Sequence, residues 1–308
     1  MTVASFGPQS RVGVIGLGSM GSGIALNLLK KGFSVRVFAR QAAAAGPFVQ
    51  GGAQTAPSAS ALAHDCDLAF LSLPDAPAIE AVLFGDEGLA KGLRPGNCVV
   101  DTSTIAATSA RDFGARLRKL GVSFLDAPVS GGQAGAQAGT LGCMIGGPSD
   151  EIDACREVMA AFCKVITRVG DLGAGQTVKA CNQVAVVGAL LGVADAITLA
   201  KSQGVDPALM REVLLGGTGR TFSLESHGPR IIEGNFKPGF RATLMRKDLR
   251  IALDTARAAG AVLPGAARAE QMLDALCESG RAEWDWCAIA LDAQKQSGMA
   301  VPEQREPS

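Results

Sequence analysis

A lysine and an asparagine stand three residues apart just after a glycine-rich turn, at Lys179 and Asn182. Residues three apart on a helix share a face, so an ammonium group and a carboxamide would point the same way. Such a pair can hold a small oxygen-rich substrate, and the ammonium group can give it a proton. The alternative is a solvated surface lysine, which is what most lysines are. The pair predicts acid–base chemistry if the rest of the chain supplies a matching site.

Few other side chains offer acid–base chemistry. The chain has no tyrosine, which excludes a dehydrogenase that uses a tyrosine–lysine pair, and neither His64 nor His227 sits in a motif that suggests catalysis. The eight cysteines form no C-x-x-C pair and do not cluster with the histidines, so no metal site is expected. Lysine is therefore the leading acid–base candidate by elimination.

The element that must position the pair is a long helix. Gly170, Gly173 and Gly175 mark a turn, and the chain then runs to Gln203 without a proline, on an apolar pattern typical of a helix. A helix of about 28 residues would be about 42 Å long. We expect it to belong to two domains at once.

A glycine-rich loop near the N-terminus offers a second kind of chemistry. The short apolar stretch from Arg11 to Gly16 predicts a buried strand, and an apolar helix follows from Ile24 to Leu29. The G-x-G-x-x-G loop between them consists of Gly16, Leu17, Gly18, Ser19, Met20 and Gly21. Between a strand and a helix, this pattern predicts a dinucleotide whose pyrophosphate meets the helix N-terminus. The alternative is a glycine-rich turn without a ligand.

The end of the second predicted strand, Ser34 to Arg40, bears on the choice of cofactor. NAD-preferring sites usually have an acid there for the ribose 2′-hydroxyl, but Ala39, Arg40 and Gln41 supply none. Arg40 could instead bind a 2′-phosphate through a charge-assisted contact. We therefore expect NADP, with NAD possible, and the alternative is a solvated arginine.

The remaining pattern predicts a mostly parallel sheet with helices on both faces, followed by a region of helices only. Strands are expected at 67–73, 97–104 and 122–128, with helical segments between them, which favours a Rossmann-type, mostly parallel sheet. After the long helix only helical spacing remains, at 207–215, 242–259, 265–278 and 282–296, with a long glycine-rich loop at 216–240. We predict an NADP-binding α/β domain at 1–171 (1–10 disordered or extended), an all-helical C-terminal domain at 172–300 that includes the long interdomain helix, and a tail at 301–308.

The predicted sheet brings further candidates to one edge. Ligands of parallel sheets bind beyond the carboxyl ends of the strands, where Leu73, Pro74 and Thr104 fall. Ser130, Gly131 and Gly132 lie beyond another strand and offer a hydroxyl and uncovered backbone N–H groups, a combination that suits a carboxylate. A flexible turn is the alternative for these three residues.

Bulk composition excludes some partners. Lysine plus arginine equals aspartate plus glutamate at 29 each, which gives no electrostatic reason to expect nucleic acid or an anionic membrane. The N-terminus has no signal-peptide pattern, and the longest near-apolar run, Val184 to Ala194, is too short to span a bilayer. We expect a soluble, cytoplasmic protein.

Taken together, these residues resemble the β-hydroxyacid dehydrogenase family, which includes 3-hydroxyisobutyrate dehydrogenase and tartronate semialdehyde reductase. Four segments carry the resemblance in order, over about residues 11 to 297: GLGSMGSGIALNL (16–28), FLDAPVSGG (124–132), GAGQTVKACNQ (173–183) and KDL (247–249). One departure is Gly23-Ile24, which stands where the family usually has Pro-Met.

The resemblance implies roles for individual residues. It assigns Lys179 as the catalytic lysine, Asn182 as its substrate-binding partner, and Ser130, Gly131 and Gly132 to the substrate carboxylate. It assigns the glycine loop, Leu73, Pro74 and Thr104 to the cofactor, and places Lys247 near the nicotinamide and the substrate. It also implies a homodimer or homotetramer built through the helical domain.

The resemblance implies hydride transfer between NADP(H) and a short 3-hydroxy or 3-oxo carboxylate. Residues 235–240 look most like the tartronate semialdehyde reductase branch, and alternatives are 3-hydroxyisobutyrate dehydrogenase and glyoxylate or succinic semialdehyde reductase. Imine reductases share the pattern but place another residue where Lys179 stands. A catalytically silent NADP-sensing module remains the alternative of another class, although it would not need Lys179, Asn182 and Ser130 together.

Overall fold

The computed structural model describes residues 5–301, which form two compact units that divide after Lys179. Each unit has its own core. The predictions for the first four residues and for the tail after residue 301 lie outside the described residues. The predicted boundary at residue 171 stays a prediction.

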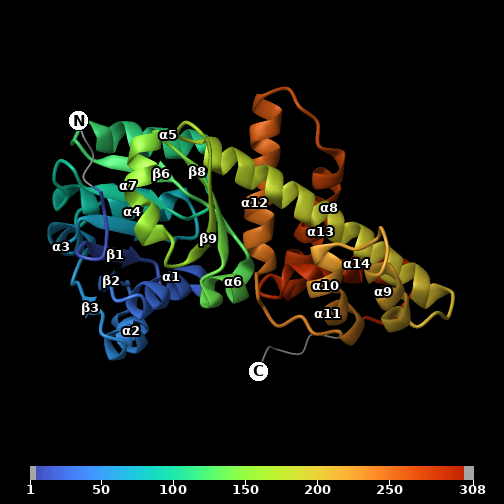
Figure 1. The fold of residues 1–308 in the computed structure, drawn as a ribbon. Helices are drawn as coiled ribbons and strands as arrows, with labels where there is room; N and C mark the ends of the chain where they lie inside the picture. Colours follow the sequence, from blue (N-terminus) through green and yellow to red (C-terminus); the bar gives the residue numbers. More distant parts are fainter. Residues whose placement is uncertain (1–4, 302–308) are drawn as a thin grey trace. The chain divides into compact units, whose positions relative to one another are not determined.

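The first unit is built on a nine-stranded sheet in the order β3-β2-β1-β4-β5-β6-β8-β7, with β9 paired to β8 (Figure 1). Pairing is parallel from β3 to β6, whereas β8 is antiparallel to β6 and β7 and parallel to β9. This confirms the predicted mostly parallel Rossmann-type sheet. The strands are β1 (Arg11–Ile15), β2 (Ser34–Phe38), β3 (Gln54–Thr55), β4 (Leu68–Leu71), β5 (Cys98–Asp101), β6 (Ser123–Asp126), β7 (Val129–Ser130), β8 (Leu141–Gly146) and β9 (Cys163–Gly170).

Helices cover both faces of this sheet because the central strands are apolar on both faces. In β4, Leu68 and Phe70 pack into the core under α1, α2 and α7, while Ala69 and Leu71 pack into the core under α3, α4 and α5. The helices are α1 (Ser19–Lys30), α2 (Gly46–Gln50), α3 (Ala59–Asp65), α4 (Ala76–Phe84), α5 (Ala107–Arg118), α6 (Gly132–Ala138) and α7 (Ser149–Met159), with 3₁₀ turns η1 (Ala42–Ala45) and η2 (Leu89–Lys91).

The second unit is helical, as predicted. Its core gathers the buried face of α8 together with α12, α13 and η4. The elements are α8 (Ala174–Ser202), α9 (Pro207–Leu215), α10 (Phe222–Ser226), α11 (Gly228–Glu233), α12 (Ala242–Ala258), α13 (Pro264–Leu276), the π-turn η3 (Cys277–Arg281), the 3₁₀ turn η4 (Trp286–Ile289) and α14 (Ala290–Gln296).

The long helix α8 runs through the predicted segment and begins in the first unit. In the second unit its buried positions Val187, Leu190, Ala194 and Ile197 recur at helical spacing in the core. By length and composition alone α8 could cross a membrane, but the core helix of a soluble protein passes the same test. One face of α8 is buried in the core of the second unit.

Two local predictions in the second unit are wrong. The segment predicted as a loop contains α10 and α11, because Thr221 caps α10 through a hydrogen bond from Leu224 N and Pro229 fits the first turn of α11. The helix predicted at 282–296 begins later, because Asp285 caps η4 through a bond from Cys287 N. In both places a local cap overrides the apolar pattern.

Candidate functional site

The glycine-rich loop between β1 and α1 makes a turn that a side chain would block. Gly16 has φ +92°, and a Cβ there would lie 2.2 Å from the carbonyl oxygen of Ser72. At Gly21 a Cβ would lie 1.8 Å from the carbonyl oxygen of Gly16. Both positions therefore require glycine, and the tight turn aims the start of α1 out beyond the end of β1.

The N-terminus of α1 is suited to an anion. Gly18 precedes the helix, and no side chain caps it, whereas Ser58 caps α3 and Asp75 caps α4. A Cβ at Gly18 would meet no atom within 4 Å, so the space above the loop is open. Uncapped backbone N–H groups beside open space fit a phosphate, and the loop residues Gly16 to Gly21 therefore fit the pyrophosphate of a dinucleotide.

The other predicted cofactor residues follow the carboxyl ends of neighbouring parallel strands. Arg40 is exposed just past β2, Leu73 and Pro74 follow β4, and Thr104 follows β5. The loops after β4 and β5 are joined, because Leu73 N donates to the hydroxyl of Ser103 over 2.8 Å. The structure therefore places these residues along the same edge of the sheet as the glycine loop.

The lysine predicted to be catalytic is buried rather than solvated. Lys179 is 7% exposed, and its Nζ donates to the carbonyl oxygen of Val129 over 2.9 Å. Val129 precedes Ser130 in β7, so within the first unit the lysine head group lies at the loop predicted to hold a carboxylate. The interpretation as a surface lysine is therefore wrong.

The serine–glycine loop starts from a paired strand and ends in a helix. Ser130 pairs with Gly142 of β8, and the next two residues, Gly131 and Gly132, are exposed with φ of +133° and +64°. This left-handed backbone favours glycine and turns the chain directly into α6. No side chain caps α6, so the loop exposes backbone N–H groups beside the serine hydroxyl.

Helix α6 packs directly on α1. A Cβ at Gly23 would lie 2.5 Å from the carbonyl oxygen of Ala136, so the two backbones touch. The buried Asn27 of α1 donates to the carbonyl oxygens of both Gly23 and Ala136 over 2.8 Å. The glycine that departs from the usual family sequence thus permits this contact.

The other two predicted site residues belong to the second unit, where a polar network links them. Asn182 donates to Gln183 over 2.9 Å, and Gln183 donates to Asp248 over 2.7 Å. Asp248 also pairs with Lys247 over 3.1 Å. Asp248 is 2% exposed, so the network fixes both predicted side chains through one buried carboxylate.

Two residues that sequence reasoning did not single out seat the start of α8. Asp126, at the end of β6, accepts bonds from the backbone N–H groups of Gly173 (2.7 Å) and Gln176 (2.8 Å). Burial raises the pKa of Asp126 to about 6, against the opposing effect of these N–H groups. The carboxamide of Gln176 is itself buried and bonded to the loop after β5. An acid at a strand end and a glutamine in a glycine turn are too common for either to stand out in a sequence.

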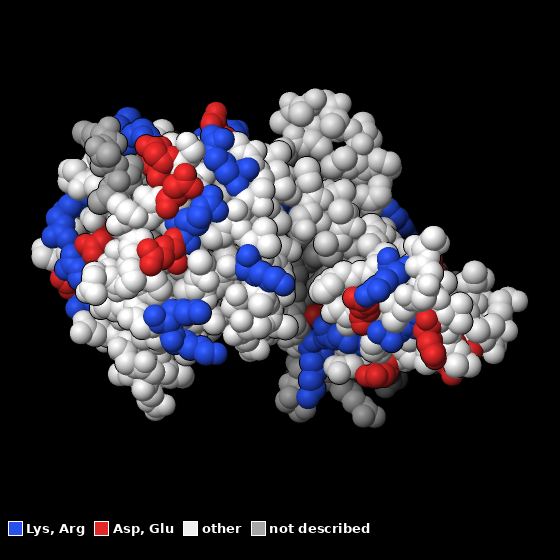
Figure 2. All heavy atoms as spheres, viewed as in Figure 1, with Lys and Arg blue, Asp and Glu red and all other residues white. Residues whose placement is uncertain are grey.

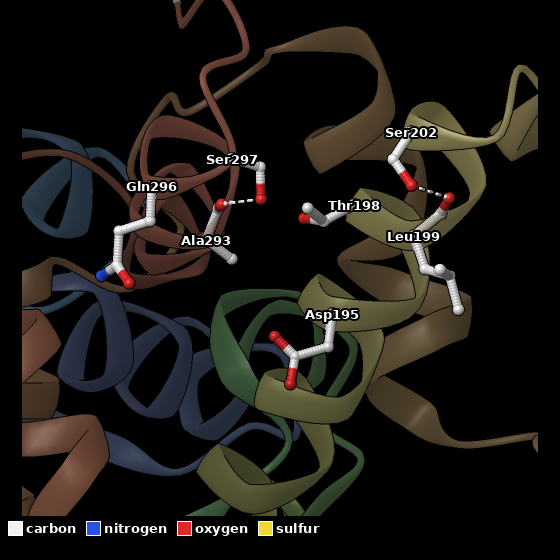
Figure 3. A pocket seen from close by; sticks show the side chains of 7 residues that line it. All are labelled: Asp195, Thr198, Leu199, Ser202, Ala293, Gln296 and Ser297. Carbon is white, nitrogen blue, oxygen red and sulfur yellow. Dashed lines mark hydrogen bonds between the residues drawn. The ribbon is translucent and has the colours of Figure 1, made fainter.

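A hollow of about 390 Å³ between α8 and α14 contains none of the predicted site residues (Figure 3). Asp195, Thr198, Leu199 and Ser202 line it from α8, and Ala293, Gln296 and Ser297 line it from the other side. Its hydroxyl groups bond to their own helices, as in Ser202 to Leu199 O and Ser297 to Ala293 O. Asp195 is the single ionisable side chain among the residues that line it.

Charges of both signs are interspersed over the visible face of the first unit (Figure 2). Ion pairs in the first unit include Arg11 with Asp67, Arg118 with Glu151 and Arg156 with Asp153. Such a surface has no broad basic field of the kind that gathers nucleic acid.

Comparisons with known proteins agree with this arrangement. Residues 11–170 match the family described as the NAD binding domain of 6-phosphogluconate dehydrogenase, and residues 173–291 match that described as NAD-binding of NADP-dependent 3-hydroxyisobutyrate dehydrogenase. The chain is 36% identical to 2-hydroxy-3-oxopropionate reductase of Escherichia coli, over 91% of this chain and 95% of that protein. It is 35% identical to NAD-dependent L-serine dehydrogenase of Pseudomonas aeruginosa, over 91% of this chain and 97% of that protein.

Solved structures give the same result. The crystal structure of 3-hydroxyisobutyrate dehydrogenase from Salmonella typhimurium superposes with a TM-score of 0.85 at 30% identity, covering 92% of this chain and all of that one. Both family matches, the identities over nearly full length and the shared fold point the same way. The chain belongs to the β-hydroxyacid dehydrogenase family of NAD(P)-dependent oxidoreductases.

Proposed function

We propose that this protein transfers hydride reversibly between NADP(H) and a short 3-hydroxy or 3-oxo carboxylate, with 2-hydroxy-3-oxopropionate as the preferred oxo substrate. One observation carries the proposal. The buried ammonium group of Lys179 bonds to Val129 O, directly beside Ser130. A cation held at a loop of exposed N–H groups suits a reaction in which an oxygen must be protonated next to a carboxylate.

Each residue then has a distinct task. Ser130, Gly131 and Gly132 bind the carboxylate through the hydroxyl and backbone N–H groups, and Asn182 adds an amide from α8. Lys179 gives a proton to the developing alkoxide in reduction and accepts it in oxidation. The glycine loop holds the pyrophosphate, Leu73, Pro74 and Thr104 contact the cofactor, and Lys247 lies near the nicotinamide. The bound cofactor supplies or accepts the hydride.

The choice of substrate rests on likeness, since the relative named 2-hydroxy-3-oxopropionate reductase covers nearly the whole chain. A panel of purified semialdehydes, assayed with NADPH by its absorbance, tests that choice. The panel contains 2-hydroxy-3-oxopropionate, methylmalonate semialdehyde, succinic semialdehyde and glyoxylate. We expect the first to have the highest kcat/KM, and a higher value for any other compound would reassign the substrate.

Replacing the lysine tests the chemistry. Lys179→Ala should lower kcat by at least about 10²-fold, the low end for loss of a positioned general acid, because no proton donor remains at the reacting oxygen. The Kd for NADPH and the substrate KM should change much less, since Ser130 and Asn182 still hold the carboxylate. Lys119→Ala is the control, because Lys119 is exposed at the end of α5 and should leave kcat unchanged. A Lys179→Ala enzyme that keeps more than about a tenth of wild-type kcat would exclude the lysine as the acid.

Cofactor preference rests on Arg40, which is exposed past β2. Its neighbour on the strand, Arg36, is already engaged by Asp65 and Gln54, so Arg40 is the better placed cation for a 2′-phosphate. Arg40→Ala should lower kcat/KM for NADPH by about 10- to 150-fold, the worth of a charge-assisted hydrogen bond, and leave NADH nearly unchanged. Equal use of NADH and NADPH by the wild type would contradict the proposal.

The second unit carries the features expected of a subunit interface. Helix α9 has no buried residue, although it is largely apolar. Leu199, Leu209, Val213 and Phe222 are each at least 60% exposed. Large apolar side chains grouped in one unit favour a protein contact, and we propose a cytoplasmic homodimer or homotetramer built through this unit. A monomeric mass by light scattering at micromolar concentration would contradict it.

A further inference from the structure

A buried glutamine joins the helix that carries the lysine to the loops that hold the cofactor. We propose that Gln176 is a positioning residue for hydride transfer, which sets the place of Lys179 relative to the bound nicotinamide ring. The inference rests on the proposed function, because it takes Lys179 as the acid and the loops after β4 and β5 as cofactor contacts.

Both polar atoms of the Gln176 carboxamide form hydrogen bonds. Its Nε2 donates to the carbonyl oxygen of Ser103 over 2.9 Å, and its Oε1 accepts from the backbone N–H of Ile105 over 3.1 Å. The residue is 1% exposed. These two bonds hold the backbone on either side of Thr104. Thr104 therefore cannot shift relative to α8 without breaking one of them.

The same contact reaches the loop after β4. The hydroxyl of Ser103, whose carbonyl accepts from Gln176, itself accepts from Leu73 N over 2.8 Å. Just before Ser103, the side chain of Thr102 donates to Leu71 O over 2.6 Å. One carboxamide therefore ties together both segments proposed to contact the cofactor.

The backbone of the first turn of α8 is held against the sheet. Gln176 N donates to Asp126, and a Cβ at the neighbouring Gly175 would lie 2.5 Å from Met144 O and 2.7 Å from Asp126 O. The first turn of α8 thus lies against the sheet without intervening side chains. Lys179 follows Gln176 by three residues on the same face, so a shift of the carboxamide is passed to the ammonium group. A misplacement of about 1 Å between reacting groups can cost about 10²-fold in rate.

Gln176→Met tests the inference, because methionine has similar length and fills the buried site without either hydrogen bond. We expect kcat to fall by about 10- to 100-fold, with the NADPH Kd within about threefold of wild type. The primary deuterium isotope effect on kcat, measured with NADPH deuterated at the transferred position, should rise, because a misaligned hydride transfer becomes rate-limiting. Thr177→Val is the matched control. Thr177 is the next residue of α8, and its hydroxyl donates to Gly173 O. The substitution removes that bond and should leave kcat and the isotope effect unchanged.

Gln176→Glu supplies a second variant of nearly the same shape. It keeps an acceptor for Ile105 N–H, but at this buried site its carboxyl group either loses the donor to Ser103 or must hold a proton to keep it, so its kcat should fall below that of the wild type. Backbone amide exchange at Ile105 should quicken in Gln176→Met and less in Gln176→Glu. This measurement needs no turnover.

The outcomes separate the inference from the proposed function. If Gln176→Met and Gln176→Glu both keep more than half of wild-type kcat while Lys179→Ala is inactive, the positioning role is overturned and the proposed function stands. If activity falls only in proportion to the fraction of protein that binds NADPH, with an unchanged isotope effect, Gln176 has a structural role alone and the inference also fails. An active Lys179→Ala enzyme would instead overturn the proposed function.

Discussion

Two buried carboxylates, one in each unit, do similar work and have pKa shifts of opposite sign. Asp126 in the first unit is fully buried and accepts bonds from two backbone N–H groups at the start of α8. Asp285 in the second unit is 1% exposed, accepts from three backbone N–H groups and pairs with Arg230 over 2.9 Å. Burial raises the pKa of Asp126 to about 6, whereas the pKa of Asp285 is lowered.

The two pKa values differ because of the neighbouring groups and not because of the extent of burial. Burial acts to raise the pKa of both carboxyl groups. For Asp285 the hydrogen bonds from Phe240 and Cys287 and the charge of Arg230 outweigh burial, whereas for Asp126 the hydrogen bonds from backbone N–H groups and the charge of Arg111 do not. Asp126, which binds the start of α8 near the candidate active site, is thus easier to protonate than Asp285, which binds a loop in the second unit.

The largest effect is expected from removing the charge of Asp285. Asp285→Asn leaves the Arg230 guanidinium, which is 23% exposed, without its carboxylate partner and replaces one carboxylate oxygen with an amide nitrogen. Breaking a buried pair costs about 3–5 kcal/mol. The only two tryptophans, Trp284 and Trp286, flank this residue, so urea unfolding followed by tryptophan fluorescence reports this unit directly. A loss below about 1 kcal/mol would place Asp285 among weak surface pairs.

A smaller effect, and one with a pH dependence, is expected from Asp126→Asn. The carboxyl group has a pKa of about 6 in the folded protein and near 3.9 when unfolded, so the folded state holds the extra proton between these values. Wild-type stability should therefore fall relative to the variant as pH rises from about 4 to about 6, by up to about 3 kcal/mol. Urea unfolding followed by circular dichroism across this range measures it. Parallel curves for the two proteins would mean that Asp126 titrates at its ordinary value.

The smallest effect is expected from a carboxylate with the same kind of bond but full access to water. Asp206 caps α9 by accepting from Ala208 N over 2.8 Å, and it is exposed. Asp206→Ala should cost about 1 kcal/mol at neutral pH, the usual worth of an N-cap. A larger loss in the fluorescence-detected unfolding would show that burial is not what separates Asp206 from the two buried carboxylates.

The fold could be predicted largely because its signals are local. Apolar strands at regular spacing identified β1, β2, β4, β5 and β6, and the uninterrupted apolar pattern identified α8. The strands β7 and β8 were not predicted individually, because β7 has only two residues and β8 is glycine-rich. The helices α10 and α11 were missed because five- and six-residue helices depend on single caps and carry little periodicity.

The candidate site was predictable in part. Residues in recognisable spacing, such as Gly16, Lys179 and Ser130, were singled out, and the structure places the last two at one loop. Gln176 and Asp126 were not, although both lie inside segments that sequence reasoning had marked. Their partners are about 50 to 73 residues away in the chain, and no local pattern encodes such pairing. The buried state of Asp248 was missed for the same reason, since its partner Gln183 is 65 residues distant.

The direct contact between α1 and α6 has a consequence for anyone who would redesign this enzyme. The helix that follows the serine–glycine loop touches the helix that follows the glycine-rich loop at Gly23 and Ala136, with no side chain between them to absorb a change. Under the proposed function, a library that varies residues 133–138 to admit a bulkier substrate should therefore lose cofactor affinity in many of its members. Gly23, Asn27 and Ala136 should therefore stay fixed. Varying residues of the neighbouring strands β7 and β8 rather than of α6 would change substrate selectivity with less effect on cofactor binding.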